Sequence, residues 1–164
     1  MDMDIRNEYY EEMAEKVDGI MRRLTDGYRR DGGCFRTADE ANPTFFGTLL
    51  VDPAQPRLAY METLPTPVPA ERRSEMIFAL NAVNSCTLFN KFYLKDFPTA
   101  DGRQEFVVEE NSLFCPGGRV TDTDVSFLLA SGMQDLAMYS AGLRGIADGS
   151  VSAADFVNSV TREV

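Results

Sequence analysis

The sequence predicts an α+β fold in which a mostly antiparallel sheet of about five strands packs against helices. Apolar residues recur at helical spacing in four segments and at strand spacing in five. The first three strand segments are joined by stretches too short for a crossover helix. The elements follow the order α-β-β-β-α-β-β-α-α, without βαβ alternation, and strands and helices are segregated. A length of 164 residues suits one domain, which we predict over residues 1–164.

The first four elements are a helix and three strands. Residues 5–28 carry apolar side chains at spacings of three and four, with acids at the start and arginines at the end, as the helix dipole favours. Residues 31–33, with two glycines, are expected to end this helix. Strands are predicted at 33–37, 44–51 and 57–63, of which 44–51 is rich in β-branched and aromatic residues. They should form antiparallel hairpins.

A proline-rich bridge leads to a second helix and a hairpin. Residues 64–69 alternate proline with other residues, which favours an extended path, and we predict a stiff bridge inside one domain. A helix is expected over 70–86. Residues 87–95 alternate in polarity as the clearest strand, and 103–110 should return as the other half of the hairpin.

The C-terminal part is predicted to be helical after a loop at 111–120. A long helix is expected from about 122 to 144, capped by Thr121 with Asp124 three positions later. Ser152 and Asp155 repeat this pattern before a last short helix.

The charge balance argues against nucleic acid as a partner. The chain has 26 acidic and 16 basic residues, for a formal charge of −10, whereas phosphate binding needs clustered cations. The one basic cluster contains Arg22, Arg23, Arg29 and Arg30. It is interpreted as a solvated helix end, with an anion-binding patch as the alternative. No apolar run is long enough to cross a bilayer, and the N-terminus lacks signal-peptide character, so we expect a soluble, cytoplasmic protein.

The reactive residues exclude several kinds of chemistry. The chain has no histidine, which removes the usual general base and the commonest metal ligand. The three cysteines are widely spaced, so neither a disulfide framework nor a zinc site is expected, and Cys34 and Cys86 should be buried as small apolar residues. We predict no catalytic residue, no metal and no cofactor.

Cys115 and Arg119 form the best candidate for nucleophilic chemistry. They flank Pro116-Gly117-Gly118 just before a predicted helix, where a cysteine can have a lowered pKa. A phosphatase-type loop separates its cysteine and arginine by five residues, and only three intervene here. A tight turn with positive φ at the glycines is therefore the preferred interpretation.

The candidate carboxylates are Glu109 with Glu110, and Asp122 with Asp124. Neighbours on a strand point to opposite faces, so the two glutamates should not converge. The two aspartates fit the first turn of a helix, where negative charge is stabilising. No calcium-loop pattern is present, so acid/base or metal chemistry is not expected at either pair.

Asparagines and aromatic residues gather near the second helix and the strands. Asn81, Asn84 and Asn90 are expected to fix the corner between helix and strand through hydrogen bonds, with binding of a peptide backbone as the alternative. Strand aromatics on one sheet face should form the core, and any on the other face would mark a partner surface. These are Phe45, Phe46, Tyr60, Phe89, Phe92, Tyr93 and Phe106.

The stretch from about residue 64 to 146 resembles the bacterial YbjN-like family. The resemblance rests on Leu64-Pro65, Val68-Pro69, Leu80-Asn81-Ala82-Val83-Asn84, Phe89-Asn90-Lys91-Phe92-Tyr93-Leu94 and Gly118-Arg119-Val120-Thr121. Members of that family are described as candidate sensory transduction regulators and share the fold of type III secretion chaperones. The resemblance implies a sheet covered by helices, frequent dimers, and binding or regulation rather than catalysis. No catalytic residues come with the family.

Three functional hypotheses follow. The leading one is a non-enzymatic interaction protein that forms a homodimer and holds a partner protein as an extended segment, at a sheet edge or across a sheet face. The second is a sensor for a small ligand, with a pocket between the sheet and the long helix. The third, an enzyme that uses carboxylates or Cys115, ranks last because histidine is absent.

Overall fold

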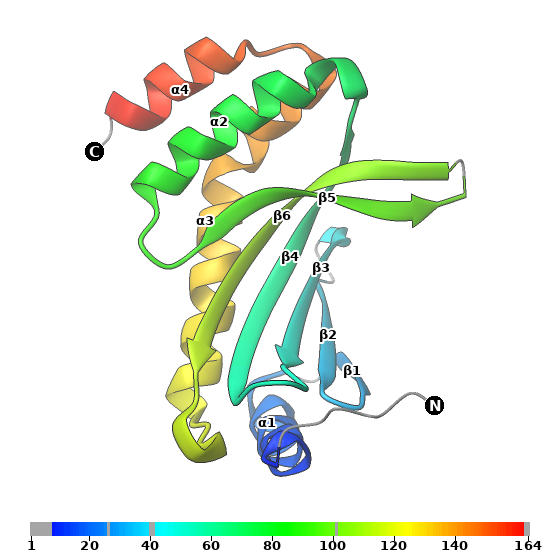
Figure 1. The fold of residues 1–164 in the computed structure, drawn as a ribbon, viewed down its shortest axis with the longest axis vertical. Coiled ribbons are helices and arrows are strands. Elements are labelled where there is room, and N and C mark those ends of the chain that lie inside the picture. Colours follow the sequence, from blue (N-terminus) through cyan, green and yellow to red (C-terminus); the bar gives the residue numbers. More distant parts are fainter. Residues whose placement is uncertain (1–7, 26, 40–41, 101, 163–164) are drawn as a thin grey trace. The chain divides into compact units, whose positions relative to one another are not determined.

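The computed structural model describes residues 8–25, 27–39, 42–100 and 102–162 (Figure 1). The helices are α1 (Tyr10–Leu24), α2 (Arg73–Cys86), α3 (Asp122–Asp148) and α4 (Ala153–Arg162). The strands are β1 (Tyr28–Asp31), β2 (Cys34–Asp39), β3 (Asn42–Val51), β4 (Arg57–Val68), β5 (Lys91–Thr99) and β6 (Gly102–Phe114). Two short 3-10 helices, η1 (Ala70–Arg72) and η2 (Pro116–Gly118), precede α2 and α3.

The six strands form one sheet in the order β1-β2-β3-β4-β6-β5. The pairs β1–β2, β2–β3 and β5–β6 are antiparallel. The α+β prediction and the predicted order of the later elements are confirmed, and the sheet has one strand more than expected. Because β1 and β5 end the order, each has one edge that no other strand of the described sheet covers.

The additional strand corrects the prediction of a helix over 5–28. Residues 5–7 lie outside the described part, and α1 ends at Leu24. Tyr28 begins β1, which pairs with β2 through a turn at Gly32, where φ is +58°. The two glycines thus turn a hairpin rather than end a helix. Tyr28 misled the assignment because it continues the helical spacing of apolar residues.

The strands on either side of α2 also differ from their predicted bounds. β5 begins at Lys91 rather than residue 87, because Thr87 caps the end of α2 and its Oγ1 donates a hydrogen bond to the carbonyl of Asn90, 2.9 Å away. The hairpin is longer than predicted, because β5 extends to Thr99 and β6 begins at Gly102. The proline-rich bridge is the end of β4, since the φ of proline is compatible with an extended strand.

The chain folds into two compact units, to both of which β4, β6 and α3 contribute. The first unit contains the residues up to Met61 and Asn111–Ser131. Its core combines one face of α1 with side chains from the strands and the start of α3. The buried cluster consists of Met13, Ala14, Val17, Ile20, Met21, Phe35, Leu49, Val51, Leu58, Tyr60, Cys115, Val125 and Leu128.

The predicted cap of α3 is confirmed, because the N–H of Thr121 donates to Asp124 over 2.8 Å and Asp124 N–H donates back to Thr121 Oγ1.

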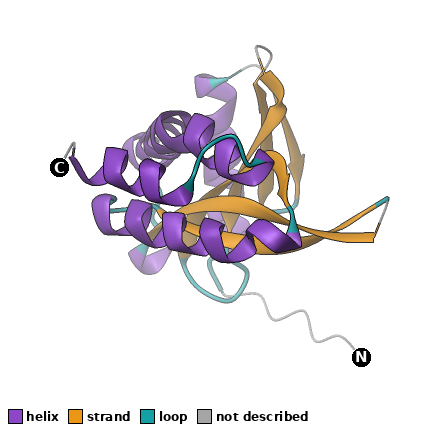
Figure 2. Cartoon of the chain, turned by 90° about the horizontal axis from the view of Figure 1, so that it is seen from above, coloured by secondary structure: helices purple, strands orange, loops and turns teal. Residues whose placement is uncertain are grey.

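The second unit contains Glu62–Glu110 and Gly132–Val164. In it α2 packs against β5 on one side, and α4 lies alongside α2 (Figures 1 and 2). Gly142 permits the close approach of α4, because a Cβ at this position would lie 2.3 Å from the ring of Phe156. The predicted cap of α4 is confirmed by the bond from Asp155 N–H to Ser152 Oγ.

Candidate functional site

The outer edge of β5 presents backbone groups that no strand pairs. The amide and carbonyl of Phe92 point outward, since both bond to a side chain of α2 rather than to β6. Nine residue pairs without a register shift join β5 to β6. In such an antiparallel pair, the N–H and C=O groups of every second residue point away from the neighbouring strand. After Phe92 these residues are Leu94 and Asp96, and their backbone groups meet no backbone partner in the described part of the chain. We call this two-residue stretch the free edge.

Both ends of the free edge are closed. At one end, Asn84 Nδ2 donates to the carbonyl of Phe92 (2.8 Å) and Phe92 N–H donates to Asn84 Oδ1 (2.7 Å). The amide of Asn84 thus replaces a residue of a neighbouring strand. At the other end, Pro98 has no N–H to offer. This confirms the structural role expected of Asn84 and limits strand pairing to a short stretch.

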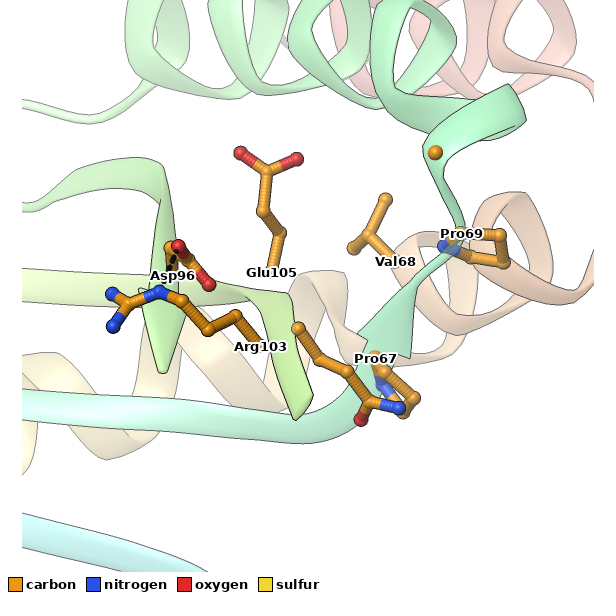
Figure 3. Close-up of a pocket in the computed structure, with 8 residues that line it drawn as sticks. Pro67, Val68, Pro69, Asp96, Arg103 and Glu105 are labelled. Atoms are coloured by element: carbon orange, nitrogen blue, oxygen red, sulfur yellow. Dashed lines mark hydrogen bonds and ion pairs between the residues drawn. The ribbon is translucent and has the colours of Figure 1, made fainter. Parts of the chain in front are cut away.

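An open groove between the end of β4 and the β5–β6 hairpin reaches one residue of the free edge, Asp96. Its volume is about 520 Å³. On one side are Pro67 and Val68 at the end of β4, followed by Pro69, and on the other is the β5–β6 hairpin (Figure 3). The lining residues are Pro67, Val68, Pro69, Ala70, Asp96, Arg103, Gln104 and Glu105.

The charges of the groove are arranged in pairs. Arg103 Nε lies 2.6 Å from Asp96 Oδ2 (Figure 3). Glu105 accepts a second ion pair from Arg73 of α2, whose Nε lies 2.9 Å from Oε2. The wall therefore carries little net charge, and its apolar part comes from the proline-containing segment.

Lysines lie on the opposite face of the same strand. Lys91 and Lys95, two of the three lysines of the chain, are exposed on β5, and the described side chains provide neither with an ion pair. Lys95 Nζ lies 5.4 Å from the centroid of the Phe97 ring. Charged side chains on an edge strand discourage pairing with arbitrary strands. The two lysines therefore also limit which strands can pair with the free edge.

A carboxyl group without a hydrogen-bonding partner is buried in the second unit. Glu109 of β6 is 1% exposed, and neither of its oxygens has such a partner among the described residues. Burial, together with the carboxylates of Asp135 and Glu62, raises its pKa to about 9, and the backbone of Leu136 only partly opposes this rise. Glu110 is half-buried and accepts a bond from Tyr93 Oη (3.0 Å). The two glutamates therefore do not converge, as predicted.

Cys115 does not have the surroundings of a nucleophile. It is buried in the core of the first unit, and burial, followed by the carboxylate of Asp124, raises the pKa of its thiol. Gly117 and Gly118 have φ of +61° and +67°, which confirms the tight turn. Cys34 and Cys86 are half-buried, so the prediction that they are buried was wrong.

The predicted ionic groups form structural pairs. Arg23 donates to both carboxylate oxygens of Asp122, over 2.7 and 3.0 Å. Asp18 lies within 4 Å of both Arg22 and Arg30. Arg29 and Arg30 belong to β1, so only Arg22 and Arg23 of the basic cluster lie at the end of α1, where all four were predicted. Within the described residues, no group of three or more cysteine, aspartate and glutamate side chains is placed to hold a metal ion.

The remaining asparagines and aromatics divide between core and surface. Asn81 is exposed, whereas Asn90 is buried and its Nδ2 donates to Asp135 over 2.6 Å. Phe92 and Tyr60 are buried, and Phe89 is exposed in the loop before β5. The remaining strand aromatics, Tyr93 and Phe106, are half-buried, and the side chains of Phe45 and Phe46 lie outside the described part.

Sequence reasoning missed the free edge and the groove because both depend on which strands are neighbours. A loop and a helix of 14 residues separate β4 from β5, and β6, not β5, lies next to β4. The one local signal was the alternation of Leu94, Asp96 and Pro98, which places the three residues on one side of the strand.

The fold is similar to that of YbjN from E. coli, a protein described as a candidate transcription regulator. The two structures have a TM-score of 0.62 and 12% sequence identity over 82% of this chain and 92% of the YbjN chain. This likeness confirms the YbjN-like fold, and the fold alone. The HopA1–SchA chaperone–effector complex is a looser match, with a TM-score of 0.47 and 18% identity over 83% of this chain and 93% of the matched chain.

No protein-family model and no curated protein sequence matches the chain. Within its described residues, the protein has no helix with the length and apolar character needed to cross a bilayer, α3 included.

Proposed function

We propose that this chain is a non-enzymatic, cytoplasmic interaction module that forms a homodimer and binds an extended segment of a partner protein. The free edge carries the proposal. It offers unpaired backbone groups at Leu94 and Asp96, and Asp96 also lines a groove of about 520 Å³. Addition of a strand to a sheet edge is a recurring way to bind an extended peptide, with affinity from backbone hydrogen bonds and specificity from side-chain pockets.

The geometry implies how the segment lies. Its backbone pairs with Leu94 and Asp96, and its side chains alternate between the two faces of the sheet. Those on the face of Asp96 lie toward the groove, where Pro67 and Val68 offer apolar contact. Asn84 and Pro98 limit the number of backbone hydrogen bonds that a partner segment can form with β5. Contacts of its side chains with the groove must therefore supply much of the specificity for one segment over another.

Other observations favour binding over catalysis. Cys115, the best candidate nucleophile in the sequence, is buried with a raised pKa. YbjN, whose fold is similar to that of this chain, is described as a candidate transcription regulator. The groove is lined by strand and η1 residues and not by α3, so it differs from the pocket that a small-ligand sensor would need between sheet and long helix.

The proposal is tested by blocking the free edge. The full chain is used to capture partners from lysate of the native host, and overlapping peptides of each captured protein are measured by fluorescence anisotropy. Leu94→Pro removes an outward N–H, at a kind of edge position where proline is tolerated. Leu94→Val is the matched control, because it keeps that N–H.

We expect an extended peptide that binds the native chain and Leu94→Val equally, and Leu94→Pro at least about tenfold more weakly, as loss of one or two backbone hydrogen bonds implies. Equal binding by Leu94→Pro, with its fold confirmed by circular dichroism, would contradict strand addition. Failure of every peptide to bind would contradict recognition of an extended segment.

A further inference from the structure

Two arginines and a threonine lie in one row across β1, β2 and β3. Arg29 pairs with Arg36 in the register of β1 and β2, and Arg36 pairs with Thr48 in that of β2 and β3. Phe35 precedes Arg36 and Leu49 follows Thr48, and both are buried in the core of the first unit. Because side chains alternate along a strand, the row lies on the other face of the sheet. We call Arg29, Arg36 and Thr48 the outer row; both arginines are exposed.

The two arginines of the outer row have no carboxylate partner among the described side chains. Arg30, the next residue of β1, differs in this respect, since its Nη2 lies 2.7 Å from Oε1 of Glu15 in α1. Like charges directly opposite each other on neighbouring strands, with Cβ atoms about 5 Å apart, destabilise the strand pair. In a chain of formal charge −10, two opposed arginines without a counter-charge are best explained by an anion that binds to both.

We infer that the outer row binds a phosphate monoester, carried by a small molecule or by a phosphorylated side chain. Two guanidinium groups carry two positive charges, which match the charge of about −1.5 to −2 on a phosphate monoester at pH 7 better than the single charge of a carboxylate. Each planar guanidinium group can donate two parallel hydrogen bonds to phosphate oxygens. The hydroxyl of Thr48, in register with Arg36, is a further donor on the same face.

Asp31 opposes the binding of an anion at the outer row. It is the one acidic residue among the described side chains of β1, β2 and β3, and it is exposed two positions after Arg29, on the same face. Its carboxylate repels a bound phosphate, so Asp31→Asn should tighten binding. The site belongs to the first unit and the free edge to the second, so this inference goes beyond the proposed function and does not depend on it.

NMR titration of the full chain with glycerol 3-phosphate, at constant ionic strength, tests the inference. We expect saturable shifts that are largest at the outer row. Arg29→Gln and Arg36→Gln should each weaken binding at least about tenfold, as loss of charge-assisted hydrogen bonds implies. Arg119→Gln is the matched control, because Arg119 is exposed in the loop before α3, and it should leave binding unchanged. Absence of saturable shifts, or equal binding by a folded Arg36→Gln, would overturn the site.

Thermal unfolding without ligand gives a second, independent measurement. In phosphate-free buffer of low ionic strength, Arg36→Gln should have a higher melting temperature than the native chain, because it removes the repulsion from Arg29, and NaCl should reduce this difference. A lower melting temperature of Arg36→Gln under these conditions would overturn the inference, since the two charges would then already be compensated.

A comparison of two phosphate monoesters identifies the source of the group. The peptide Ala-Ala-phosphoserine-Ala-Ala binds more tightly than glycerol 3-phosphate if the site takes a phosphorylated segment, because β1 ends the sheet and its outer edge is then available to the peptide backbone. Equal affinity supports a small phosphorylated molecule. Binding of the unphosphorylated peptide with the same affinity as the phosphorylated one would overturn recognition of phosphate.

Discussion

At the scale of single residues, Glu109 shows how the interior of the second unit depends on protonation. Its folded-state pKa is raised from 4.5 to about 9. Between these values the unfolded chain releases the proton and the folded chain keeps it, so the free energy of unfolding falls as pH rises. The stabilising contribution is complete below pH 4.5 and is lost as pH approaches 9.

Glu109→Gln should remove this dependence, since glutamine stays neutral at every pH. At pH 7.5 we expect the variant to be more stable than the native chain by about 2–4 kcal/mol, with little difference at pH 4.5. Urea unfolding at several pH values measures the free energy of unfolding. Glu110→Gln, the same change at the half-buried neighbouring position, is the control. Parallel pH profiles of native chain and Glu109→Gln would refute a buried, neutral Glu109.

At the scale of elements, α2 closes part of the β5 edge through Asn84. Asn84→Ala removes two hydrogen bonds to Phe92, and we expect a loss of about 1–3 kcal/mol in the free energy of unfolding. The exchange of the Phe92 amide with solvent should accelerate at the same time. Asn81→Ala, at an exposed position of the same helix, should change neither quantity. An unchanged exchange rate at Phe92 in Asn84→Ala would contradict the assigned direction of this edge.

The elements also show what the sequence can predict. The caps of α3 and α4 were predicted correctly because each depends on residues three positions apart, as in Thr121 and Asp124. β1 was missed because Tyr28 fits the helical spacing and the strand is stabilised by pairing with β2. The outward direction of Glu110 and the burial of Glu109 follow from strand alternation. The approach of Asp135 to Glu109 does not, since it depends on where α3 packs.

At the scale of the whole molecule, the central claim is that the protein acts through contact with another protein at the free edge. In the unbound chain, the amides of Leu94 and Asp96 should exchange rapidly, because they point away from β6. The amides of Tyr93 and Lys95 should exchange slowly, because alternation directs them toward β6.

Hydrogen exchange of β5 amides, followed by NMR on the full chain with and without the captured peptide, tests this claim most directly. We predict that the peptide slows exchange at Leu94 and Asp96, while Tyr93 and Lys95 stay slow in both states. A bound peptide that leaves Leu94 and Asp96 exchanging at their unbound rates would contradict the claim.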